Sequence, residues 1–224
     1  MSKKLYEESD IQAIADAIRE KNGTTNTYTV AEMGGGIRDI PSSNIDNFID
    51  GTVTSIESNA IEVLQYCCFK FTSLISVSLP NATKIGTNSF NSCTALTSVY
   101  IPNVITINMY VFQKCNKLTS INLPKVTTIL NSAFQECSKL SLMDCGNLKS
   151  IGPAAFHSCS SLTTFILRTT AIATLSNINA FAGTQIDSGT GYIYVPDELV
   201  ESYKVATNWS TYASQIKPLS EYIE

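Results

Sequence analysis

The feature that most constrains the fold of this chain is an interval of 22 residues at which its apolar side chains recur. Five columns of residues keep this interval along the middle of the 224-residue sequence. They are leucine (Leu74, Leu96, Leu118, Leu140, Leu162), isoleucine (Ile85, Ile107, Ile129, Ile151), phenylalanine (Phe90, Phe112, Phe134, Phe156), cysteine (Cys93, Cys115, Cys137, Cys159) and a mixed apolar column (Val77, Val99, Ile121, Met143, Phe165). Because so many columns share one period, each unit is predicted to be one coil that stacks on the next.

The head of each repeat alternates apolar and polar residues, as a half-buried strand requires. In one repeat Val99 and Ile101 alternate with Ser98 and Tyr100, and Pro102 ends the strand because proline has no N–H to donate. Strands stacked in this way form a parallel sheet with a spacing of about 4.8 Å. A period of roughly 20–29 residues with this head is the signature of a leucine-rich-repeat solenoid.

Each repeat ends in a second structural signal. Phe112 and Cys115 lie three positions apart, which predicts a single helical or 3₁₀ turn that packs both side chains inward. The predicted fold class is therefore α/β, a solenoid of 22-residue coils with a curved parallel sheet. Residues 1–46 are expected to form a small helical N-terminal module, residues 47–190 the solenoid, and residues 191–224 a strand–helix C-terminal cap.

The two flanking parts carry helix signals of their own. Capping boxes at residues 9–12 and 29–32 predict two helices in the N-terminal module. Their apolar stripes lie on a module too small to bury them, which predicts that residues 1–46 form a homo-oligomer or dock the protein to a virion. In the cap, residues 192–195 alternate as a strand, and Asp197 and Asn208 are each predicted to cap a helix. The second of these helices would place Trp209 and Ile216 inward.

Charge and hydropathy exclude several classes of protein. A formal net charge of −4 and a pI near 5.1 argue against a nucleic-acid partner, which would need a basic surface. No run of about 20 apolar residues is present, so membrane insertion is not expected. Residues 1–10 contain two lysines without an apolar segment behind them, so no Sec signal is visible. Such a protein would reach the outside by lysis, on a particle or by another route.

A search for catalytic chemistry finds one candidate. His157 is the single histidine and lies two residues from Cys159, which suggests thiol catalysis. A structural role is favoured, because Cys159 belongs to the buried column and the position of His157 is polar in the other repeats. No metal-ligand spacing and no cofactor motif occurs, so no catalytic residue, metal or cofactor is predicted and the protein is not expected to be an enzyme. Neighbouring column cysteines could form disulfides, although packed thiols are favoured.

The remaining candidate for function is the concave face of the predicted sheet. It displays the strand residues that alternate with the core, and in solenoids this face is the usual binding surface. The candidate ligand-binding residues are Ser76, Ser78, Ser98, Tyr100, Ser120, Asn122, Leu142, Asp144, Thr164 and Ile166. Their hydroxyl, amide and carboxylate groups suit a glycan or a protein loop, whereas Leu142 and Ile166, expected to be exposed on neighbouring coils, favour a protein. The alternative is a face that is only hydrated.

Three segments resemble known families. Residues 151–159, Ile-Gly-Pro-Ala-Ala-Phe-His-Ser-Cys, resemble the BspA-like leucine-rich repeat of bacterial surface proteins, and the resemblance extends over about residues 50–186. Residues 14–19 and 36–41 resemble an N-terminal module of tail-associated proteins of phages and prophages of Gram-positive hosts. The Tyr-Val-Pro…Tyr-Lys…Asn-Trp ending resembles that of BspA-like proteins of gut bacteria and their phages.

These observations predict a non-enzymatic binding protein. The resemblances imply a phage or prophage tail component, located on the virion or an extracellular surface, that recognises a bacterial surface glycan or protein. The alternative is a bacterial cell-surface adhesin or an intracellular, cytoplasmic protein-interaction scaffold of the same repeat family.

Overall fold

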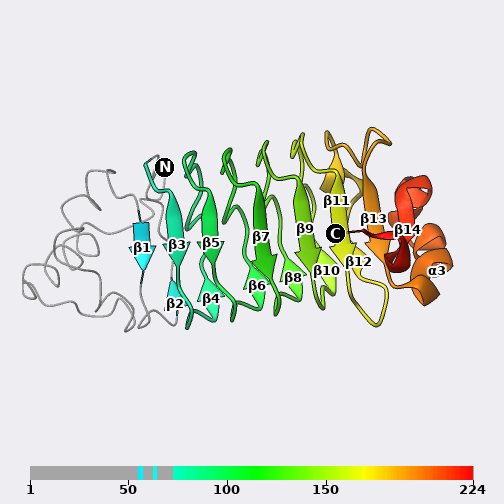
Figure 1. The fold of residues 1–224 in the computed structure, drawn as a ribbon, viewed down its shortest axis with the longest axis horizontal. Helices are drawn as coiled ribbons and strands as arrows, with labels where there is room; N and C mark the ends of the chain where they lie inside the picture. The colour runs from blue at the N-terminus through cyan, green and yellow to red at the C-terminus, as the bar shows by residue number, and fades with distance from the viewer. Residues whose placement is uncertain (1–54, 58–62, 65–72, 224) are drawn as a thin grey trace, which may run out of the picture.

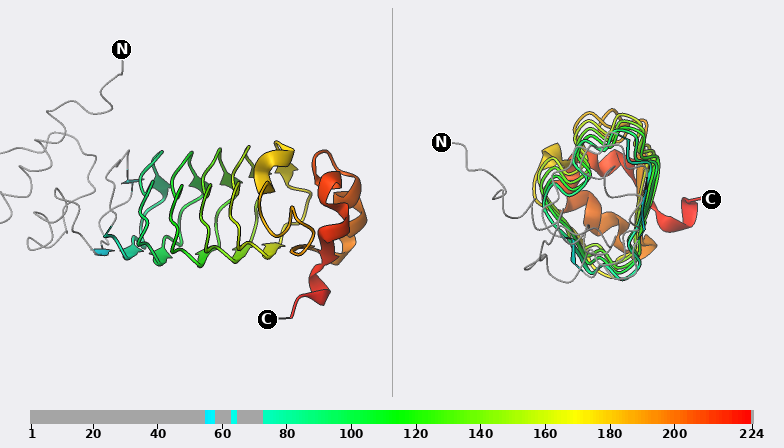
Figure 2. Two further views of the ribbon diagram at one scale, coloured as in Figure 1. Left: turned by 90° about the horizontal axis from the view of Figure 1, so that it is seen from above. Right: turned by 90° about the vertical axis from the view of Figure 1, so that its left-hand side faces the viewer.

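The chain winds into a row of stacked coils, with its C-terminal residues packed against one end (Figure 1). Seen along the axis of the row, successive coils superimpose on one another (Figure 2). This computed structural model describes residues 55–57, 63–64 and 73–223. The helices predicted in the N-terminal module, residues 1–46, lie outside the described residues.

Each coil contributes one strand to each of two sides of the solenoid, and all of the strand pairs are parallel. On the first side, called the strand face below, lie β1 (Ser55–Glu57), β3 (Ser76–Ser78), β5 (Ser98–Tyr100), β7 (Ser120–Leu123), β9 (Leu142–Cys145) and β11 (Thr164–Leu167). On the second side lie β2 (Val63–Leu64), β4 (Lys84–Ile85), β6 (Thr106–Ile107), β8 (Thr128–Ile129), β10 (Ser150–Ile151) and β12 (Thr174–Leu175). The register pairs residues one period apart, as in Ser120 with Leu142, so the sequence columns become stacks in space.

The strand face is divided between β5 and β7. On this side β1, β3 and β5 form one hydrogen-bonded sheet, and β7, β9 and β11 belong to another. The second side is not divided, because β6 pairs with β8 and all six of its strands form one sheet. At the division Val99 is only partly buried, although its column is otherwise buried wherever the structure describes it. The solenoid is therefore more open on the strand face at this point.

The third side of each coil is a turn, and the sequence prediction was right in part. The Cys115 N–H donates to the Phe112 carbonyl at 3.1 Å and both side chains are buried, as expected. The turn is not helical or 3₁₀, because Lys114 between these two residues has a positive φ of 62°. Residues with positive φ recur at two positions per coil, and they are Asn88, Ser92, Tyr110, Lys114, Ser132, Glu136, Ala154 and Ser158. In this backbone conformation every second N–H group points toward the next coil. The Phe112 N–H donates to the Ala133 carbonyl at 2.8 Å, so the third side is also a hydrogen-bonded ladder.

The predicted apolar columns form the core. Phe90, Phe112, Phe134 and Phe156 are fully buried and stack with centroid distances of 5.3–5.6 Å. The described cysteines, which are Cys93, Cys115, Cys137, Cys145 and Cys159, are buried with reduced thiols, in agreement with the favoured interpretation. Three column thiols donate to the phenylalanine carbonyl of the preceding coil, as Cys137 Sγ does to Phe112 at 3.0 Å. The cysteine column thus contributes packing and hydrogen bonds between coils.

The cap closes the end of the solenoid. The last coil ends with the 3₁₀ helix η2 (Ile178–Phe181), and the cap consists of β13 (Tyr192–Val195), η3 (Asp197–Leu199), α3 (Val200–Val205), η4 (Trp209–Gln215), β14 (Ile216–Pro218) and η5 (Leu219–Glu221). Trp209 is buried against Phe181 and Tyr203, and its Nε1–H donates to the Ala173 carbonyl at 2.6 Å. The cap therefore covers the last coil with aromatic side chains whose polar groups are satisfied.

The strand of the cap was predicted correctly, but its helix caps were not. Asn208 has a positive φ of 64° and donates to the Leu175 carbonyl at 2.7 Å instead of capping a helix. Asp197 accepts a hydrogen bond from the Ser220 N–H at 3.0 Å, and α3 begins after Leu199. Ile216 is buried, as predicted, but it lies in β14, which extends the sheet beside β13.

Candidate binding surface

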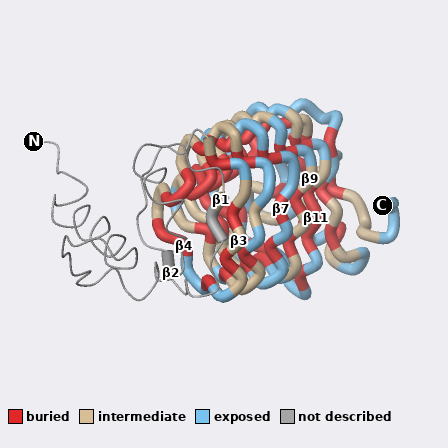
Figure 3. The backbone as a smooth tube through the Cα atoms, turned by 60° about the vertical axis from the view of Figure 1, so that its left-hand side comes forward, coloured by how far each residue is buried: buried red, intermediate tan, exposed pale blue. Residues whose placement is uncertain are grey.

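The strand face is built by the alternation of residues along each strand. In β7 the side chains of Ser120 and Asn122 are exposed, whereas Ile121 and Leu123 are buried. The same alternation repeats from coil to coil and is visible along the labelled strands in Figure 3. Because β strands turn successive side chains to opposite sides, one stripe of each coil faces solvent.

The structure confirms the outward position of nine of the ten predicted residues. Ser98, Tyr100, Ser120 and Asn122 are exposed, and these four lie in β5 and β7, on both sides of the division. Five others are half-buried, and they are Ser76, Ser78, Leu142, Asp144 and Thr164. The most accessible part of the candidate surface is therefore its middle.

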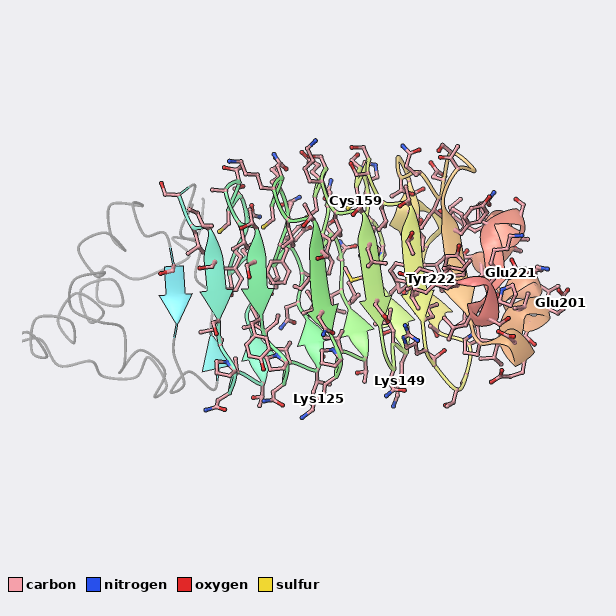
Figure 4. The ribbon with its side chains drawn as sticks, viewed as in Figure 1. Lys125, Lys149, Cys159, Glu201, Glu221 and Tyr222 are labelled. Carbon is pink, nitrogen blue, oxygen red and sulfur yellow. The ribbon has the colours of Figure 1, made fainter. Side chains whose placement is uncertain are left out.

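Ile166 is the exception, because only 1% of its surface is exposed. In the register of the sheet it lies beside Tyr194 of β13, and the ring of Tyr222 packs against that of Tyr194 at 5.1 Å between centroids. The C-terminal tail reaches back over the strand face here (Figure 4). The expectation that Ile166 is exposed beside Leu142 is therefore wrong, because the alternation that predicts an outward position takes no account of chain that folds over it.

The strand face also contains residues that the repeat pattern does not identify. β13 and β14 continue the sheet beyond β11, so Tyr192, Tyr194 and Lys217 extend the face into the cap. Lys217 Nζ lies 5.8 Å from the centroid of the Tyr192 ring. The alternation Tyr-Ile-Tyr-Val at residues 192–195 is the signal that could have placed this strand beside residues 164–167.

Asp144 is held by an arginine that was not among the predicted residues. Arg168 donates to both carboxylate oxygens, at 3.2 Å from Nε and 2.9 Å from Nη2 to Oδ2. Arg168 follows β11 directly, where an earlier repeat has proline (Pro124). This two-point contact fixes the carboxylate and offsets its charge, so Asp144 on this face is not an isolated anion.

The chemistry of Cys159 and His157 does not support thiol catalysis. Cys159 is fully buried, and its thiol donates to the Phe134 carbonyl at 3.0 Å. Burial raises the pKa of this thiol well above its usual value, which disfavours the reactive thiolate. His157 is half-buried, and its Nδ1 lies 3.0 Å from the hydroxyl oxygen of Ser158.

The column that contains His157 has a structural role in the preceding coils. The side-chain amide of Asn91 donates to Gln113 at 2.9 Å, and that of Gln113 donates to Gln135 at 2.9 Å. The column is therefore a hydrogen-bonded amide ladder on the third side, where a hydrated polar position was expected.

Two further kinds of site were searched for in the described residues. Within residues 55–57, 63–64 and 73–223, no group of three or more histidine, cysteine, aspartate or glutamate side chains could hold a metal ion. In the same part of the chain no helix is long and apolar enough to span a membrane.

Stacked parallel strands, a buried leucine ladder and an open polar face define a leucine-rich-repeat solenoid. The chain belongs to the family of the BspA type leucine rich repeat region, whose model matches residues 62–187 in six copies. Members of this family are typically non-enzymatic proteins that bind protein or surface partners at the cell surface or outside the cell.

Several solved structures are similar to part of this chain. A leucine-rich repeat protein from Eubacterium ventriosum is 23% identical, with 60% of this chain and 41% of that chain covered and a TM-score of 0.47. A leucine-rich repeat protein from Bacteroides ovatus is 17% identical, with 62% and 48% covered and a TM-score of 0.41. The leucine rich repeat protein of T. pallidum is 22% identical, with 64% and 56% covered and a TM-score of 0.36. The chain thus spans only 41–56% of the length of these proteins. No curated protein is significantly similar to it.

Proposed function

We propose that this protein recognises a bacterial surface glycan or protein through its strand face. The observation that carries the proposal is the row of exposed polar side chains at Ser98, Tyr100, Ser120 and Asn122, which lies over a buried core. Tyr100 is 55% exposed, and it offers a ring face and a hydroxyl without a large loss of side-chain entropy on binding. The binding character that is typical of the family supports the proposal.

Binding of the fluorescently labelled full chain to intact bacterial cells and to purified wall fractions tests this proposal. The test variant is Tyr100→Ala with Asn122→Ala, which removes two exposed side chains without opening the core. The control is Thr174→Ala with Asn179→Ala, which alters two exposed residues in β12 and η2, away from the strand face. Saturable binding that falls at least about tenfold in the test variant alone is expected, because contacts near the centre of an interface dominate its energy. Equal binding by both variants would contradict a role for this face.

We infer further that the setting is a phage or prophage tail, and the support is the resemblance of residues 14–19 and 36–41 to tail-associated modules. A bacterial adhesin of the same family is the second candidate, favoured by the surface location typical of the family. Peptide mass spectrometry of purified particles from an induced culture, against washed cell walls of the same strain, separates the two. Enrichment with the particles supports a tail component, and enrichment in the walls supports an adhesin.

A further inference from the structure

Positive charge is concentrated in the coils, although the chain as a whole carries a net charge of −4. Residues 73–186 contain six lysines and one arginine against one aspartate and one glutamate, a formal surplus of five positive charges. Net charge of one sign on a surface raises the local concentration of partners of the opposite sign. Over the whole predicted solenoid, residues 47–190, eight basic side chains face six acidic ones, a formal surplus of two, so the positive charge is concentrated in residues 73–186. The charge of the whole chain, which argued against a nucleic-acid partner, therefore does not describe these coils.

Four of these lysines lie at the two ends of neighbouring strands. Lys117 and Lys125 lie before and after β7, Lys139 lies before β9, and Lys149 lies at the corner after β9, directly before β10. Lys125 and Lys149 are seen together along one long edge of the solenoid in Figure 4. We call these four residues the lysine frame, because they bracket the part of the strand face that carries Ser120 and Asn122.

The charges of the lysine frame are exposed and free of carboxylates. All four residues are exposed, and within residues 73–223 none of them forms an ion pair. The acidic side chains of residues 73–190 have other partners: Glu136 lies 4.0 Å from Lys114, Asp144 within the frame is held by Arg168, and Asp187 accepts a hydrogen bond from the Gly183 N–H at 3.0 Å. Lys125 Nζ donates to the Asn103 side chain at 2.6 Å, which orients the ammonium group without neutralising it.

The arrangement of the frame favours an extended partner over a small anion. Coils stack at about 4.8 Å, so the cations repeat along the axis on both sides of the strand face. A small anion would need converging donors, whereas a linear chain with repeated negative charges can meet several separated ammonium groups at once. The centre of the frame presents the hydroxyl of Ser120 and the amide of Asn122, which can hydrogen-bond to hydroxyl groups of such a chain. Asp144 lies beside Asn122 in the sheet, and its charge is offset by Arg168.

From this arrangement we propose that the ligand of the strand face is an anionic, hydroxyl-rich polymer of the bacterial envelope, held by the lysine frame across β7 and β9. The inference rests on the proposed function and names the chemistry of its ligand. Phosphate groups of a polyol-phosphate polymer and carboxylates of a uronic-acid polysaccharide supply the same negative charge, and the two are separated by experiment. A nucleic acid or an acidic polypeptide shares the charge but not the hydroxyl-rich backbone between charges.

Equilibrium binding of the full chain to four immobilised polymers tests the inference. The probes are poly(glycerol phosphate), polygalacturonate, neutral dextran and poly(L-glutamate), with a duplex DNA of about 20 base pairs as a fifth. Binding to poly(glycerol phosphate), to polygalacturonate or to both is expected. Raising NaCl from about 50 to about 200 mM should weaken this binding about tenfold, because the lysines displace counterions condensed on the polymer and added salt opposes their release. The polymer that is preferred identifies phosphate or carboxylate as the recognised group.

Two double variants locate the contact, and one variant controls for net charge. Lys125→Ala with Lys149→Ala, and Lys117→Ala with Lys139→Ala, should each weaken binding about five- to tenfold and flatten its salt dependence. Lys204→Glu changes the net charge by the same two units but lies in α3 of the cap, where Lys204 pairs with Glu201 at 2.7 Å. This control is expected to bind within about twofold of the unmodified chain.

Several outcomes would overturn the inference. They are equal binding to dextran, equal or tighter binding to poly(L-glutamate) or DNA, failure to bind either anionic polymer, and unchanged binding by both lysine double variants. If the chain still binds intact cells and loses that binding in the Tyr100→Ala and Asn122→Ala variant, the proposed function survives and only the ligand chemistry is wrong. If the chain does not bind cells at all, the proposed function itself fails.

Discussion

The phenylalanine column links the coils at the level of single residues. Phe134 lies between Phe112 and Phe156, at centroid distances of 5.3 and 5.5 Å, and is fully buried. Phe134→Ala is expected to lower the free energy of unfolding by about 3–5 kcal/mol, because the cavity opens between two coils that cannot collapse onto it. Urea unfolding followed by circular dichroism measures this loss. A loss below about 1 kcal/mol would show that the ring is not packed as described.

The cysteine column should make the free energy of unfolding fall as the pH rises into the alkaline range. Burial raises the pKa of the Cys137 thiol well above its usual value, chiefly because the thiolate would lose its hydration. Below about pH 8 the thiol is protonated in both the folded and unfolded states, so its contribution to stability is constant. Above its usual pKa the unfolded chain ionises and the folded chain does not. The unfolding free energy should then fall by up to about 1.4 kcal/mol per pH unit for each such thiol.

Cys137→Ser isolates this effect. A serine hydroxyl can replace the hydrogen bond to the Phe112 carbonyl but does not ionise in this range. The urea midpoint of the unmodified chain should decline between pH 8.5 and pH 10 more steeply than that of the variant, a range set by the usual thiol pKa of about 8.5. Parallel declines in the two proteins would show that Cys137 does not contribute to the alkaline loss of stability.

At the level of elements, the division of the strand face should be visible in backbone dynamics. β7 and β9 pair over four residues, whereas β5 and β7 belong to separate sheets. Amides at such a division have fewer hydrogen bonds to lose before they exchange with solvent. We expect the amides of Ser98–Tyr100 to exchange with deuterium faster than those of Leu142–Cys145, as measured by NMR. Equal protection in both strands would show that β5 pairs with β7 in solution as well as with β3.

The turn ladder on the third side explains how coils with little helix remain regular. The Phe134 N–H donates to the Ala155 carbonyl at 2.8 Å, as the Phe112 N–H does to Ala133. The left-handed residues that make this possible are mostly not glycine, since Ser132 and Glu136 have φ of 53° and 61°. Such conformations are less favourable for residues with a Cβ, so their repetition indicates that the bonds between coils offset the local cost.

At the scale of the whole molecule, the cap determines whether the end of the solenoid is covered. Trp209→Ala is expected to lower the unfolding free energy by about 3–5 kcal/mol and to expose the side chains of the last coil, which should promote association. Thermal unfolding together with light scattering measures both effects. Trp209→Phe keeps one aromatic ring but loses the second ring of the indole and the bond to Ala173, so its loss should be smaller, about 1–3 kcal/mol. Equal losses in the two variants would contradict the packing role of the indole.

The repeat explains why much of the fold could be predicted from the sequence. Residues such as Leu96 and Leu118 are one period apart, so the contact between their coils follows from local pattern once the coils stack in register. Outward positions such as Ser120 and Asn122 follow from the same alternation. Contacts between neighbouring coils therefore join residues that are distant in the sequence, yet they follow from a pattern that can be read locally.

Features outside that rule were decided by the tertiary structure alone. The burial of Ile166, the contact of Tyr222 with Tyr194 and the two-point bond of Arg168 to Asp144 depend on where non-repeating chain crosses the coils. Period and alternation specify which side of a strand a residue faces, because side chains alternate with the pleat. They do not specify what another segment places over that side, because that depends on the path of the whole chain.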